Sequence, residues 1–125
     1  MNAILTSPIT INEIKHALDE MDLDKALGPD GFSARFIKTC WNIIKKDLYK
    51  MILKSQTCQN IGGNTNLALL ALIPKEKGAS NFNRFRPISF YNIGYKLITK
   101  VTTNRLKGHL PEIILDIQGG FFKGR

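Results

Sequence analysis

An apolar run followed by a cationic turn constrains the fold of this chain more than any other stretch. The run, residues 67–73, lies between polar residues and Pro74, which favours a short buried strand over a helix. Residues 78–83 are rich in Gly, Ser and Asn, which are typical of turns. A second extended segment, residues 85–90, contains Pro87, which cannot donate to a ladder and is confined to edge strands. The stretch therefore predicts an edge β-hairpin.

Cations gather on both arms of this predicted hairpin, near its turn. Lys75 and Lys77 share one side of the first arm, and Arg84 and Arg86 share one side of the second, because strand side chains alternate. Glu76 is the one acidic residue among them. The cluster could bind phosphate groups, or it could be solvated charge that prevents edge-to-edge pairing.

Helical patterns on both sides of the hairpin make the predicted fold class α+β. A capping box at residues 10–13 is followed by an apolar stripe with helical spacing over residues 14–21. A lysine-rich helix with a solvated outer face is expected over residues 42–55, and the last helix over residues 91–110, ended by Pro111. We expect about four helices, with the hairpin between the third and the fourth.

Two stretches before the hairpin are less regular. Residues 1–10 are expected to form a frayed leader. The turn at residues 28–31, GPDG, is neither a dinucleotide fingerprint nor a P-loop, since it lacks GxGxxG and Gly-Lys-Ser/Thr. Asp30 in this turn is predicted to cap a helix over residues 32–39.

The net charge of +8 is unevenly distributed. Residues 1–74 hold eight Lys and Arg against seven Asp and Glu, whereas residues 75–125 hold ten against three. This asymmetry favours a nucleic-acid partner over a membrane, because no long apolar or basic amphipathic anchor accompanies it. Lys96, Lys100 and Lys107 form a stripe on the last predicted helix, which could follow a nucleic-acid backbone or only keep the surface soluble.

Other classes of protein are disfavoured by what the sequence lacks. Cys40 and Cys58 are far apart and both histidines are isolated, so no zinc site is expected. No apolar run approaches the ~20 residues that a membrane span requires. Two thiols without a secretion signal fit a reducing, intracellular compartment, the cytoplasm or the nucleus.

Four motifs are spread along the sequence after residue 10: DKALGPDGFSARFIKTCW, ALIPKEKGASNFNRFRPIS, NIGYKLITKVTTNRLKGHLPEII and QGGFFKGR. In this order they closely resemble the fingers region of the reverse transcriptase of LINE-type (non-LTR) retrotransposons. The resemblance implies that residues 1–125 are the N-terminal fingers fragment of a right-hand RNA-directed DNA polymerase, truncated before the palm. The alternatives to a polymerase fragment are a small stand-alone basic module that binds nucleic acid, and an inert retrotransposon relic.

The resemblance also implies what this fragment would contribute. Nucleotidyl transfer needs carboxylates that hold two metal ions, and in reverse transcriptases these lie in the palm. No Tyr-x-Asp-Asp string occurs here, so neither catalytic residues nor metal ligands are expected, and Mg²⁺ is implied only for the complete enzyme. Cations on the two arms of the fingers hairpin contact the incoming deoxynucleoside triphosphate in related enzymes, and the matching positions are Lys75 and Arg86.

The implied partners of the complete enzyme include an RNA template and a DNA primer. Arg105 belongs to the family's Asn-Arg-Leu motif, and two cations stand at the end of the last motif. With these, eight cations are expected to contact nucleic acid: Lys77, Arg84, Lys96, Lys100, Arg105, Lys107, Lys123 and Arg125. The sequence predicts no oligomeric state.

Overall fold

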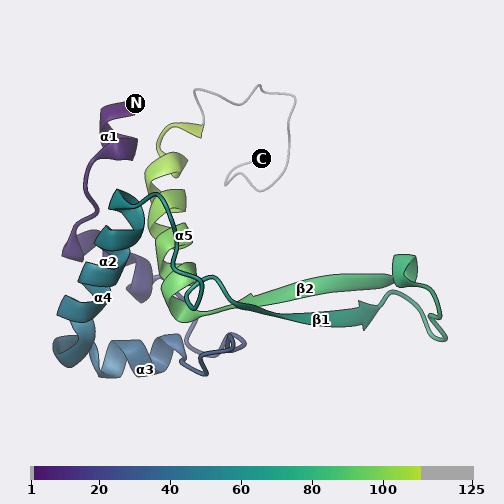
Figure 1. The fold of residues 1–125 in the computed structure, drawn as a ribbon. Coiled ribbons are helices and arrows are strands. Elements are labelled where there is room, and N and C mark those ends of the chain that lie inside the picture. Colours follow the sequence, from purple (N-terminus) through teal and green to yellow (C-terminus); the bar gives the residue numbers. More distant parts are fainter. Residues whose placement is uncertain (1, 111–125) are drawn as a thin grey trace.

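Helices packed against one another carry a hairpin that projects away from them (Figure 1). The computed structural model describes residues 2–110. Its elements are α1 (Asn2–Thr6), α2 (Ile11–Asp19), α3 (Ala34–Thr39), α4 (Trp41–Thr57), β1 (Ala68–Pro74), a 3₁₀ turn (Phe82–Arg84), β2 (Phe85–Tyr91) and α5 (Ile93–Lys107). The α+β fold class is confirmed. Because α1 was not expected, the hairpin follows the fourth described helix instead of the third.

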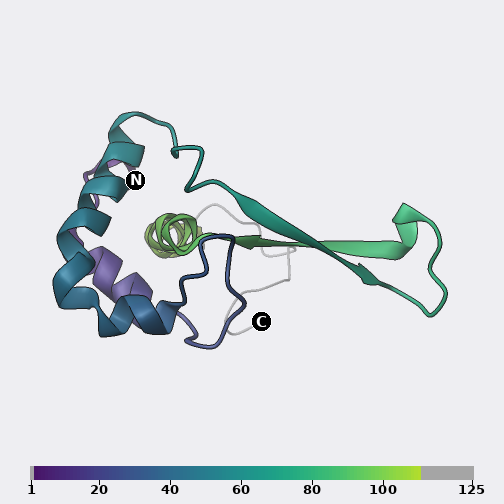
Figure 2. The same ribbon diagram turned by 60° about the horizontal axis from the view of Figure 1, so that its bottom comes forward.

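Helix α5 lies beside α2 and α4, and the hairpin leads away on its other side (Figure 2). Leu97 and Val101 of α5 are four residues apart, so they share one face of the helix, and both are fully buried. Ile14 and Leu18 give α2 a matching buried face, and Ile52 of α4 completes the contact. The apolar stripe predicted over residues 14–21 therefore forms part of the core, together with the buried face of α5.

The N-terminal segment differs from the frayed leader expected over residues 1–10. Residues 2–6 form α1, and Ile9 is buried in the core. Gln56 of α4 holds the segment from the other side: its Nε2 donates to the Ser7 carbonyl at 2.8 Å, and its Oε1 accepts from the Ile9 amide at 3.0 Å. The segment is fixed by a helix far along the chain, which its own residues could not indicate.

The two strands of the hairpin are antiparallel, with Leu72 opposite Pro87 and Ile73 opposite Arg86. The predicted strands are confirmed, but the expectation that the first is buried is wrong. Leu70 is 64% exposed and Leu72 is 46% exposed, because no other described segment covers either face of the hairpin. Apolar side chains on both faces are thus left open to solvent (Figure 1).

Asp30 does not cap the helix that follows it, contrary to the prediction. That helix, α3, begins at Ala34, and its cap is Ser33, whose Oγ accepts from the Phe36 amide at 3.1 Å. The Asp30 carboxylate instead accepts from the Ile93 amide, at the first turn of α5, at 3.2 Å. The turn at residues 28–31 folds back onto α5, so the Asp30 carboxylate bonds to a helix that is distant in the sequence.

Candidate functional site

The structure brings Lys75 and Arg86 to one face of the hairpin, near its tip. Arg86 lies opposite Ile73 in the ladder, and Lys75 follows two residues later, so all three side chains share a face. The ladder continues past the strand end, because the Lys75 amide donates to the Arg84 carbonyl at 2.8 Å. Lys75 and Arg86 are therefore diagonal neighbours, about 7–8 Å apart. Both are exposed, and two cations at this spacing can contact one phosphate chain together.

The other two hairpin cations differ in their contacts. Arg84 pairs with Glu76 through its Nη1 at 2.9 Å, and both side chains are more than half exposed. An exposed pair of this kind is worth little and can open for a ligand. Lys77 is exposed and has no ion-pair partner among the described residues. Lys75 has no ion-pair partner in the described structure either, but its Nζ donates a hydrogen bond to the Asn83 carbonyl at 2.9 Å.

Two of the three lysines in the predicted stripe on α5 make surface contacts with other parts of the chain. The Lys96 ammonium donates to the Ala26 carbonyl at 2.7 Å, and Lys100 pairs with Glu20 at 3.1 Å. Lys107 is exposed, and nothing in residues 2–110 pairs with it. Of the three lysines, Lys107 is thus the one free to meet a nucleic-acid backbone without breaking a described contact.

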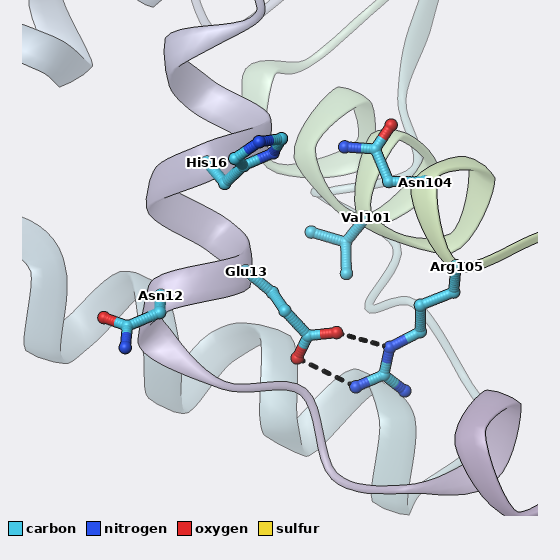
Figure 3. A pocket seen from close by; sticks show the side chains of 6 residues that line it. All are labelled: Asn12, Glu13, His16, Val101, Asn104 and Arg105. Carbon is cyan, nitrogen blue, oxygen red and sulfur yellow. Dashed lines mark hydrogen bonds and ion pairs between the residues drawn. The ribbon is translucent and has the colours of Figure 1, made fainter. Parts of the chain in front are cut away.

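Arg105, which the sequence predicted to contact nucleic acid, bonds to Glu13 of α2 (Figure 3). Its guanidinium makes a fork with Glu13, with Nε at 2.6 Å and Nη2 at 2.9 Å from the two carboxylate oxygens. It also donates to three carbonyls of the N-terminal segment, those of Leu5, Ser7 and Pro8. The Arg105 side chain is only 9% exposed. Binding a phosphate would require these hydrogen bonds to break.

The first two residues of the Asn-Arg-Leu motif join α5 to the other helices. Asn104, the residue before Arg105, donates from Nδ2 to the Glu20 carboxylate at 2.8 Å. The Glu13 carboxylate also accepts a hydrogen bond from the Thr10 amide at 2.8 Å, which completes the capping box predicted for α2. These acids therefore hold α5 and the N-terminal segment against α2.

Bonding to Arg105 lowers the pKa of Glu13 from its ordinary 4.5 to about 2, because these hydrogen bonds favour the charged carboxylate. The burial of the group acts in the opposite direction, and the bonds from Thr10 add to the lowering. Arg105 shows the matching change, with its pKa raised by the same hydrogen bonds. The pair is therefore charged over the whole physiological range of pH.

We expect the contribution of Glu13 to stability to disappear in acid. The folded pKa lies below the unfolded one, so this contribution is complete above pH 4.5 and is lost as the pH falls towards 2. Because 34% of the Glu13 side chain is exposed, solvent screening leaves about 1–2 kcal/mol. Urea unfolding of the wild type and of Glu13→Gln at a series of pH values measures the difference.

The matched control for this experiment is Asp47→Asn, at an exposed acid of α4. The gap between the wild type and Glu13→Gln should close between pH 4.5 and about 2, while the gap to the Asp47 variant should stay small throughout. A gap for Glu13→Gln that does not change with pH would contradict the role of the carboxylate.

Two of the predicted cations lie outside the described residues, and three cations that were not predicted as site residues lie on α4. Lys123 and Arg125, also expected to contact nucleic acid, fall outside the described residues. Lys46, Lys50 and Lys54 stand four residues apart on α4, exposed and without a partner in residues 2–110. Their spacing was visible in the sequence and was read there as a solvated face. Helix α4, which carries this row, is on the opposite side of the molecule from the hairpin tip (Figures 1 and 2).

The described residues offer neither a metal centre nor a membrane span. Between residues 2 and 110, no three His, Cys, Asp or Glu side chains gather as ligands for a metal ion. No helix in that range is long and apolar enough to cross a bilayer.

Comparison with known proteins places similar sequences in transposable elements. No family model matches the chain. It is 29% identical over 121 residues to the transposon TX1 uncharacterized 149 kDa protein of Xenopus laevis, which covers 97% of this chain and 9% of that protein. It is 32% identical over 108 residues to the retrovirus-related Pol polyprotein from type-1 retrotransposable element R2 of Nasonia vitripennis, covering 84% and 10% respectively. The chain thus spans about a tenth of the length of these curated relatives.

Proposed function

The chain is related to proteins of non-LTR retrotransposons, and we propose that it is the fingers part of their RNA-directed DNA polymerase, which binds phosphates without catalysing transfer. The observation that carries this proposal is the placement of Lys75 and Arg86 on one exposed face of a projecting hairpin. The triphosphate of an incoming deoxynucleotide is the proposed ligand of these two residues. The backbone of an RNA template or DNA primer is the proposed ligand of the cations around them.

The two residues suit different parts of this task. Arg86 offers a planar fork that binds two phosphate oxygens and keeps its charge at neutral pH. Lys75 supplies a compact point charge on a longer, flexible stem. Pro87 directly follows Arg86 and fixes the backbone φ angle there. Since the described residues gather no metal ligands, the Mg²⁺ of a complete polymerase would have to be held by other residues.

The exposed apolar faces of the hairpin support a fragment of a larger domain over a stand-alone module. Leu69 and Ile73 on one face and Leu70 and Leu72 on the other are all 46% exposed or more. Independent stability of a hairpin normally requires packing against a further layer, and a patch of this kind marks an interaction surface. A palm and further finger elements would supply such a layer.

We expect the isolated chain to bind single-stranded RNA weakly, with a salt dependence that the hairpin cations dominate. Each phosphate contact adds about 0.7 to the magnitude of the slope of log K against log salt for a single strand. Replacing Lys75, Lys77 and Arg86 by Gln should therefore reduce that slope by up to about 2. Fluorescence anisotropy of a labelled oligonucleotide at several salt concentrations measures it.

The control removes the same charge from another surface. Lys46, Lys50 and Lys54 of α4 are exposed and lie away from the hairpin tip, so replacing them by Gln should change the slope less. If both triple variants reduce the slope of log K against log salt equally, the binding depends on net charge and the hairpin has no special part in it.

A further inference from the structure

The base of the hairpin is held to the helical body by a network around a buried asparagine. Asn92 lies between β2 and α5 and is only 5% exposed. Its Oδ1 accepts from the Asp30 amide at 2.9 Å, and its Nδ2 donates to the Asn64 carbonyl at 2.6 Å. Asp30 makes a further hydrogen bond through its carboxylate, which accepts from the Ile93 amide. Segments from three parts of the chain thus meet at one residue.

The backbone of the turn at residues 28–31 packs directly on the same point. A Cβ at Gly28 would lie 2.3 Å from the Tyr91 carbonyl oxygen, well inside any real contact, so only glycine allows this approach. The Lys96 ammonium, bonded to the Ala26 carbonyl, ties the preceding loop to the first turn of α5 as well. The turn is therefore pressed against the hairpin base and bonded to it.

The length of the hairpin amplifies any movement at this base. Arg86 is five residues from Tyr91, the last residue of β2, which corresponds to about 17 Å along a strand. A rotation of about 5° at the base would displace Arg86 by about 1.5 Å, and a misplacement of about 1 Å can cost ~100-fold in rate. The direction of the hairpin must therefore be set at its base.

We propose that Gly28, Asp30 and Asn92 form a joint that fixes the direction of the hairpin, with Asp30 and Asn92 as positioning residues for Lys75 and Arg86. The effect on nucleotide binding rests on the function proposed above. The mechanical claim does not, because it concerns the geometry of this chain alone. Neither residue touches the proposed ligand.

Two spin labels can measure the direction of the hairpin in the full chain. One replaces Leu72, exposed on β1, and the other replaces Ile43, which is 81% exposed on α4. The two native thiols are first removed as Cys40→Ala and Cys58→Ser. Pulsed dipolar spectroscopy then gives the distribution of distances between hairpin and body. Circular dichroism of each variant checks that the helices are retained.

The unaltered joint should give one narrow distance distribution. Asp30→Ala removes the hydrogen bond from the Ile93 amide to the charged carboxylate, so the population outside that distribution should rise about 10-fold or more. Gly28→Ala should have the same effect through its clash with the Tyr91 carbonyl. Asp30→Asn, which keeps one acceptor oxygen and is the variant to use if Asp30→Ala does not fold, should give a smaller rise.

The matched control is Asp22→Ala. Asp22 is in the same connection between α2 and α3, and its carboxylate accepts from the Asp24 amide at 3.1 Å and has no described hydrogen bond to Gly28, Asp30 or Asn92. It should leave the distribution unchanged. The joint is overturned if the parent chain already shows a broad distribution, or if folded Asp30→Asn and Gly28→Ala variants both keep the narrow one.

A second measurement separates the joint from the proposed function. In a chimera that carries a related palm and thumb, Asp30→Asn should raise the nucleotide KM, and this effect should largely vanish when Arg86 is already alanine. A broadened hairpin with an unchanged KM would support the joint and overturn the triphosphate role.

Discussion

Replacing Arg105 by alanine should lower the free energy of unfolding by about 2–4 kcal/mol. The guanidinium is 9% exposed and joins α5 to Glu13 and to three carbonyls of the N-terminal segment. Its removal would leave the Glu13 carboxylate without its strongest partner and these carbonyls without their donor. Breaking a buried pair costs about 3–5 kcal/mol, and the value here is smaller because Glu13 is partly exposed. Urea unfolding followed by circular dichroism measures the change.

The control is Lys107→Ala, at an exposed cation two residues along α5 that lacks a partner within the described structure. It should change stability by less than about 0.5 kcal/mol. Arg105→Lys should recover part of the loss, because the charge remains while the fork is gone. A loss below about 1 kcal/mol for Arg105→Ala would return this residue to the set of surface cations available for nucleic acid.

Replacing Arg86 by alanine should lower kcat/KM for the nucleotide by about 10-fold or more in a chimera that carries a related palm and thumb. A hydrogen bond to a charged group is worth about 1.5–3 kcal/mol, and the proposed contact between Arg86 and a triphosphate is of this kind. The chain without a palm should show no template-directed synthesis. Steady-state kinetics at varied nucleotide concentration supply the measurement.

Variants of neighbouring cations test the geometry of the proposal. Arg86→Lys should recover only part of the activity, because lysine cannot bind two oxygens with a planar fork. Lys75→Ala should act in the same direction as Arg86→Ala, and Lys77→Ala, nearer the turn, should matter less. Lys50→Ala on α4 is the matched control and should leave the nucleotide dependence unchanged. If Arg86→Ala also leaves it unchanged in an active chimera, the hairpin cations are solvated surface.

The sequence alone determined those features that depend on neighbouring residues. The capping box of Thr10 and Glu13 starts α2 where it was predicted, because both of its hydrogen bonds lie within one turn. The apolar run, the turn residues and Pro87 likewise predicted both strands of the hairpin, since strand and turn preferences act over a few residues. Lys75 and Lys77 were predicted to share one side of the first arm, but both lie beyond the end of β1, so strand alternation does not decide how they lie relative to each other.

Tertiary structure decided the roles that depend on distant partners. Asp30 caps α5, 63 residues away, and Arg105 bonds to Glu13, 92 residues away, so neither could be assigned from local patterns. Asn92 lies inside the helix predicted over residues 91–110, whereas in the structure it precedes α5 and its side chain bonds to two loops and not to its own helix. The register that puts Lys75 and Arg86 on one face was fixed only when the strands paired, because each arm's pattern is compatible with more than one alignment.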